Sequence, residues 1–150
     1  MTLQNLLRIG KVKEHAPTGA EVMRLLAAVD RNLADSAVES ISDETRFDAA
    51  YKAVMQCALV AMMSSGYRPS TNEPGHQQTM IQSLPLTLGA SNDVWVVLDA
   101  LRRKRNASDY TGAPITPDMV RECVAQAKSL RARLREHLAS HHAELMKNSK

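Results

Sequence analysis

Apolar residues recur at spacings of three and four along every long segment of this sequence, and charged residues fill many of the positions between them. This period matches one face of an α-helix and differs from the strict alternation of a half-buried strand. The first such stripe consists of Val22, Leu25, Leu26, Val29, Leu33, Ala37 and Ile41. The chain has 20 Ala and 16 Leu but one Phe and one Trp. Its core is therefore expected to be aliphatic and built from packed helices, not from a β-sandwich or barrel.

Residues that favour the N-cap position of a helix stand just before the long apolar stripes. These residues are Thr18, with Glu21 three positions later, Ser42, Ser91, and Thr116, which Pro117 follows. The predicted helices cover residues 19–40, 43–65, 76–88, 91–108 and 117–144, with no sheet. The second of them is apolar nearly all round and is expected to be the central one. We therefore predict an all-α fold, an up-and-down antiparallel bundle of about five helices.

A chain of 150 residues suits one domain. We expect residues 1–17 to form a loose arm, 18–146 a single helical domain, and 147–150 a frayed tail. The longest apolar run has seven residues, from Cys57 to Met63, which is too short to cross a bilayer. The N-terminus lacks the pattern of a signal peptide, and two cysteines make no disulfide framework. A cytoplasmic protein with reduced cysteines and no membrane partner is expected.

The net charge of +3 hides an uneven distribution. Residues 1–75 carry eight Lys and Arg against nine Asp and Glu, whereas residues 76–150 carry eleven against seven. Nine basic and three acidic residues lie between Arg102 and Arg135. This excess is compatible with a polyanionic partner, and equally with a solvated helix face.

The fourth predicted helix places an arginine where its apolar stripe would continue, because Arg105 follows Leu98 and Leu101 at helical spacing. Such a guanidinium must reach a partner, extend to solvent or face another chain. Asp109 lies one turn later and offers a local ion pair that needs no function. The functional alternative treats Arg105, Asn106 and Tyr110 as catalytic groups at the helix end. In that case the neighbouring Arg102, Arg103, Lys104 and Asp109 would belong to a nucleic-acid-binding surface.

Four segments of the chain form a recognisable set. They are Phe47-Asp48-Ala49-Ala50-Tyr51, Gly66-Tyr67-Arg68, Leu84-Pro85-Leu86-Thr87-Leu88-Gly89 and Arg105-Asn106-Ala107-Ser108-Asp109-Tyr110-Thr111-Gly112. In these segments the chain resembles bacterial HEPN-domain proteins. The resemblance covers about residues 18–140 and is most specific over 84–112. It implies an antiparallel helical bundle that forms a homodimer. Many members are metal-independent ribonucleases of toxin–antitoxin or defence systems, and others bind RNA or nucleotides without cutting or partner a nucleotidyltransferase.

The catalytic pattern of that family is an arginine, a polar residue, a short spacer and a histidine. Arg105 and Asn106 match its start, and Tyr110 stands where the histidine is expected. Imidazole exchanges protons near neutral pH, whereas a phenol, with a pKa near 10, is a weak base there. The resemblance thus implies an RNA- or nucleotide-binding protein, which is a metal-independent endoribonuclease if it is an enzyme. The alternative is a non-catalytic interaction module of the same fold, with a nucleotidyltransferase, an antitoxin or another protein as its partner.

Histidines elsewhere in the chain are candidates for the base that Tyr110 replaces. His76 follows Pro74 and Gly75 at a helix start, where a loop position explains it. His137 and His141 are four apart, a spacing that can hold zinc, but no third ligand is fixed by the sequence. Histidine also suits the negative end of a helix dipole. We therefore expect no metal and no cofactor.

Overall fold

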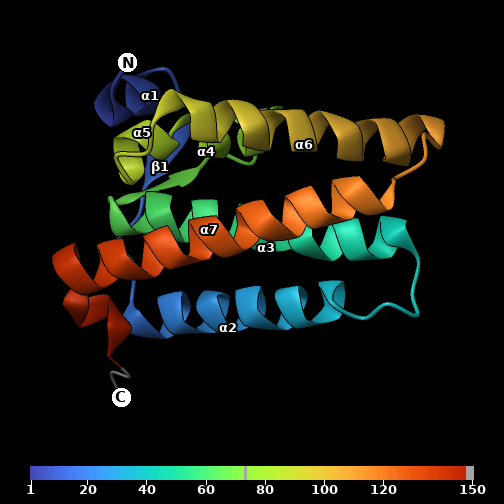
Figure 1. Cartoon of the computed structure of the whole chain (residues 1–150). Coiled ribbons are helices and arrows are strands. Elements are labelled where there is room, and N and C mark those ends of the chain that lie inside the picture. The colour runs from blue at the N-terminus through green and yellow to red at the C-terminus, as the bar shows by residue number, and fades with distance from the viewer. Residues whose placement is uncertain (73, 148–150) are drawn as a thin grey trace.

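Four long helices lie side by side in the computed structural model, which describes residues 1–72 and 74–147. In Figure 1, α3 and α7 form a middle layer, with α2 on one side and α6 on the other. The long helices are α2 (Gly19–Ser36), α3 (Asp43–Ser64), α6 (Asn92–Thr111) and α7 (Pro117–His141). The short α4 (His76–Gln82) and α5 (Leu84–Thr87) pack against α3 and α6 at one end of the bundle. The prediction of an all-α helical bundle is confirmed.

The predicted caps begin the helices, with one difference in their hydrogen bonds. Thr18 and Glu21 form a reciprocal capping box at the start of α2. Ser42 accepts from the backbone of Thr45, and Thr116 starts α7 in the same manner. Ser91 precedes α6, but its side chain makes no capping hydrogen bond. Three of the four caps therefore satisfy backbone N–H groups that the first turn would otherwise leave unpaired.

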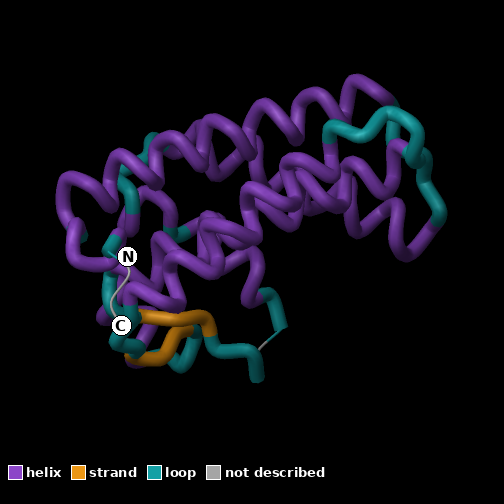
Figure 2. Tube along the Cα trace, turned by 90° about the horizontal axis from the view of Figure 1, so that it is seen from below, coloured by secondary structure: helices purple, strands orange, loops and turns teal. Residues whose placement is uncertain are grey.

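The prediction of a loose arm over residues 1–17 and of no sheet is wrong. Residues Leu3–Arg8 form α1, and β1 (Val12–Glu14) pairs antiparallel with β2 (Tyr67–Pro69). Figure 2 shows the two strands side by side, in orange. Leu6 and Val12 are buried in the common core, which holds the segment in place. Elements of six and three residues are too short to show a hydrophobic period in the sequence.

Several helix boundaries differ from their predicted positions. The helix predicted over 76–88 is two helices that meet at Ser83, with Pro85 in the first turn of the second, where its missing N–H does no harm. The first predicted helix ends four residues early at Ser36, and α6 continues to Thr111. Gly112 then ends α6 with φ of 70°, a left-handed conformation that suits glycine. Of the tail predicted over 147–150, residues 148–150 lie outside the described part.

Helix α3 lies at the centre of the core, as its sequence predicts. Thirteen of its 22 residues are buried, and α2, α4, α5, α6 and α7 all contact it. Burial raises the pKa of the Cys57 and Cys123 thiols to about 12, so both remain protonated at neutral pH. Within the described residues, no helix combines the length and apolar character needed to cross a membrane.

The capping geometry leads to a stability prediction. Thr18→Ala removes the side-chain acceptor of a complete capping box and should lower the free energy of unfolding by about 1 kcal/mol. Ser91→Ala is the matched control, because Ser91 makes no capping hydrogen bond. Urea titrations followed by circular dichroism measure both. An equal loss for the two variants would contradict the role given to the capping box.

Candidate functional site

Arg105 reaches partners within its own chain. Its Nε donates to Oδ1 of Asp48 on α3 at 3.0 Å, and Oδ2 of Asp109 lies 3.8 Å away. Its Cζ lies 5.1 Å from the ring centroid of Tyr51, within the range of a cation–π contact. Of the three outcomes that the sequence leaves open for this arginine, the structure thus favours an intrachain partner.

Tyr51 is the buried residue in this contact. Its side chain is 2% exposed, and its hydroxyl donates to Oε1 of Gln77 on α4 at 2.8 Å. Burial raises the pKa of Tyr51 to about 12, although the nearby Arg105 and Arg102 oppose the shift. The phenol is therefore a neutral hydrogen-bond donor and a core residue, as its apolar stripe predicts. Asp48, Tyr51, Gln77 and Arg105, hereafter the Arg105 cluster, link α3, α4 and α6.

The Arg105 cluster keeps the guanidinium charged. Partial burial lowers the pKa of Arg105, but the hydrogen bond and the negative charge of Asp48, together with Asp109, outweigh burial and raise the pKa. Arg105 can contact both Asp48 and Tyr51 because these two residues are three apart and so lie on one face of α3. Nothing in the sequence pairs Asp48 with Arg105, because 57 positions separate them.

A second carboxylate, also missed by the sequence analysis, holds two of the predicted nucleic-acid-binding residues. Asp99 is 4% exposed and accepts from Nε of Arg102 at 2.8 Å, and Arg103 Nη2 lies 3.1 Å from its other oxygen. The spacing of three and four residues along α6 is the signal that could have found these pairs. The Arg102 side chain is 18% exposed, whereas the Arg103 side chain is 69% exposed. Arg103 therefore presents most of its length to solvent.

Tyr110 does not join Arg105. The two residues are five positions apart on α6, which corresponds to about 140° around the helix axis. Arg105 faces α3, whereas Tyr110 is 84% exposed. Asn106 is half-buried, and Lys104 and Asp109 are exposed. The three residues predicted as catalytic are thus not gathered around one point within a single chain.

The last turns of α6 contain no buried residue. Buried residues on this helix are Leu98, Asp99 and Leu101, and none of residues 102–111, all of which the structure describes, is buried. In Figure 1 this half of α6 extends to the end of the bundle opposite the strands. It presents a helical surface with Arg103, Lys104 and Tyr110 open to solvent.

The histidines at the end of α7 form a separate cluster. The ring of His137 lies 4.9 Å from that of His141 and 5.5 Å from that of His142. Burial lowers the pKa of His137, and the two neighbouring histidines add to the effect. Across residues 1–72 and 74–147 no three metal-ligating side chains are placed to hold an ion. His76 lies at the start of α4.

The Arg105 cluster leads to a prediction about stability. Arg105→Ala and Asp48→Asn should each destabilise the fold, and a double-mutant cycle should give a coupling of about 0.5–1 kcal/mol, since the pair is partly screened by solvent. Arg121 and Asp118 form the control pair, with side chains 70% and 86% exposed. Their coupling should be smaller. A larger coupling for the control pair would contradict the structural role of Arg105.

Comparison with protein-family models, with curated proteins and with solved structures found no match to this chain. The resemblance to HEPN domains thus stays a prediction from the quoted segments, and the functional argument rests on the contacts and exposures described above.

Proposed function

We propose that this protein is a HEPN-like RNA-binding protein that holds single-stranded RNA on the exposed C-terminal half of α6. The observation that carries the proposal is the exposure of Arg103 and Tyr110, 69% and 84%, on a half-helix without buried residues. A solvated helix end needs neither an aromatic ring nor a run of cations, and a surface that binds single-stranded nucleic acid combines both.

The arrangement of these side chains suits the phosphates and the bases of an RNA strand. Arg103, Ala107 and Tyr110 follow one another at spacings of four and three, so they share one face of α6. Lys104 adds a second cation beside Arg103. The cations attract phosphates and release counterions, while the tyrosine ring offers a stacking platform for a base. The small Ala107 leaves that ring accessible.

Binding is better supported than cleavage. Metal-free cleavage would need a base to activate the ribose 2′-OH and an arginine to stabilise the phosphorane. Arg105 already contacts Asp48, Asp109 and the ring of Tyr51, and the phenol of Tyr110 is a weak base at neutral pH. A phosphate at Arg105 would have to compete with two carboxylates. Arg103 also pairs with Asp99, but through Nη2 alone, and its side chain is 69% exposed. The proposal therefore assigns RNA contacts to Arg103, Lys104 and Tyr110.

A protein-interaction module is the second candidate function. Val96, Arg103 and Tyr110 follow one another in steps of seven, and Val96 is 49% exposed. A helix from a second copy or from a partner such as a nucleotidyltransferase or an antitoxin could pack along this row. The resemblance implies a homodimer, but Arg105 does not need a second copy as its partner, because it has partners in its own chain. The homodimer stays a prediction that rests on this exposed row.

The RNA-binding surface is tested by fluorescence anisotropy with a labelled single-stranded RNA at several salt concentrations. Arg103→Ala/Lys104→Ala should weaken binding and make the fall of log K, the association constant, with log salt shallower by about 1.4. Each phosphate contact on a single strand contributes about 0.7 to this slope. Tyr110→Ala should weaken binding about 5-fold or more, with an unchanged salt slope, because stacking releases no counterions.

The matched control is Arg121→Ala/Lys128→Ala, which removes the same charge from exposed positions on α7. Its salt slope should stay close to that of the unaltered protein. An equal loss for the two double variants would mean that net charge, and not the surface on α6, attracts RNA. Failure of the unaltered protein to bind RNA at low salt would end the proposal.

Tyr110→His separates binding from catalysis. The variant carries the arginine and histidine of the family pattern, but Arg105 remains held by Asp48 and Asp109. We therefore expect no metal-free ribonuclease activity in the variant, measured on a labelled RNA in the presence of a chelator at neutral pH. RNA cleavage that appears in Tyr110→His and disappears in Tyr110→His/Arg105→Ala would contradict this expectation and restore the catalytic assignment.

A further inference from the structure

A cavity of about 470 Å³ opens between α2, α3, β2 and α4, apart from the proposed RNA-binding surface. Its volume lies within the range of small-molecule sites. Apolar side chains from four elements form most of its wall. They are Leu25 of α2, Leu59 and Met63 of α3, Pro69 of β2 and Met80 of α4.

The wall has a buried part and an open part. Met63 and Met80 are 5% and 6% exposed, whereas Leu25 and Leu59 are only half-buried, although they lie on two of the most closely packed helices. An apolar group seated against the two leucines would remove more of their surface from water. The flexible methionine side chains can adjust to an irregular apolar ligand.

The rim of the cavity is basic. Arg24, Arg68, His15 and His76 line it, with Glu21 as the carboxylate that the structure places there. Both oxygens of Glu21 lie close to His15 Nε2, at 3.2 and 3.1 Å, and one of them also accepts from the backbone N of Thr18. The hydrogen bond from Thr18 lowers the pKa of Glu21, which keeps that carboxylate charged and in place.

The two arginines of the rim have no such contact within the part of the chain that the structure describes. Among residues 1–72 and 74–147, no carboxylate lies within ion-pair distance of Arg24 or Arg68. Lys13 stands opposite Arg68 in the β1–β2 pairing and adds positive charge at this edge. A guanidinium recognises a carboxylate through two parallel N–H donors. The charge of the rim therefore complements an anionic headgroup.

We propose that this cavity is a binding site for an amphipathic carboxylate, with its apolar chain against Leu25, Leu59 and Met80 and its carboxylate held by Arg24 and Arg68. The wall and the rim each exclude a simpler ligand. An inorganic anion would leave the leucines half-exposed, and a neutral apolar molecule would make no use of the two guanidinium groups. An unbranched saturated carboxylate meets both requirements. The site is independent of RNA binding.

Isothermal titration calorimetry with decanoate, below the concentration at which it forms micelles, tests the proposal. The unaltered protein should bind one decanoate per chain in a saturable manner. Inorganic phosphate, which offers only charge, should bind at least tenfold more weakly. Arg24→Ala/Arg68→Ala should weaken decanoate binding at least tenfold, and Leu59→Glu should do the same by placing a like charge on the wall. Thermal melts confirm that each variant remains folded.

The matched control is Arg8→Ala/Arg31→Ala, which removes two exposed arginines that do not line the cavity. Its affinity for decanoate should stay within twofold of that of the unaltered protein. Three results would overturn the proposal. They are no saturable binding of decanoate, phosphate binding as tight as that of decanoate, and an equal loss of affinity in the control and the rim variant.

Discussion

The fold depends on one requirement above all, which is that the apolar surface of α3 must be covered. A helix with apolar side chains around most of its circumference cannot leave that surface in water, so several helices have to pack around it. Helices α2 and α7 cover two of its sides, and α4, α5 and α6 cover another (Figure 1). Because small residues such as Ala53 and Ala61 alternate with larger ones, the neighbours approach closely.

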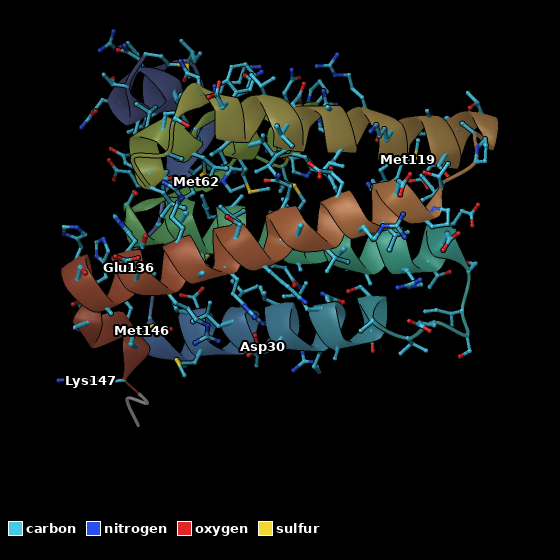
Figure 3. The ribbon with its side chains drawn as sticks, in the orientation of Figure 1. Asp30, Met62, Met119, Glu136, Met146 and Lys147 are labelled. Atoms are coloured by element: carbon cyan, nitrogen blue, oxygen red, sulfur yellow. The ribbon has the colours of Figure 1, made fainter. Side chains whose placement is uncertain are left out.

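Ion pairs then link the covering helices to one another and to α3. Asp30, which Figure 3 labels on α2, accepts from Arg131 and Arg135 of α7 at 3.1 and 3.2 Å. Arg105 connects α6 to α3 in a comparable way. Since α6 contributes few buried residues, the contact of Arg105 with Asp48 and Tyr51 is among those that hold its second half near the bundle. The same helix therefore offers one face to the core and one to solvent.

The long helices were predictable because each has a strong period and its own start signal, as Thr18 and Ser42 illustrate. The short elements were not predictable, because β1 becomes a strand only when β2 lies next to it, and the two are more than fifty residues apart.

The candidate site, too, was predictable only in part. The sequence showed that Arg105 had to reach a partner, extend to solvent or face another chain, and only tertiary packing brings Asp48 to it. The orientation of Tyr110, in contrast, could have been predicted from its spacing of five residues from Arg105 on one helix. The half-open cavity beside β2 had no sequence signal, since its wall comes from four separate elements.

The two buried cysteines give this bundle a built-in probe of its own motion. Cys57 and Cys123 lie on α3 and α7, both fully enclosed, and Sγ of Cys123 lies 3.9 Å from the carbonyl oxygen of Phe47. A thiol reacts only as an exposed thiolate, so a labelling reagent gains access to either residue only in moments when the helices around it separate. The rate of modification at each cysteine therefore reports how often its part of the core opens, without any substituted residue. Comparing the two rates would show whether the bundle opens as one unit or layer by layer.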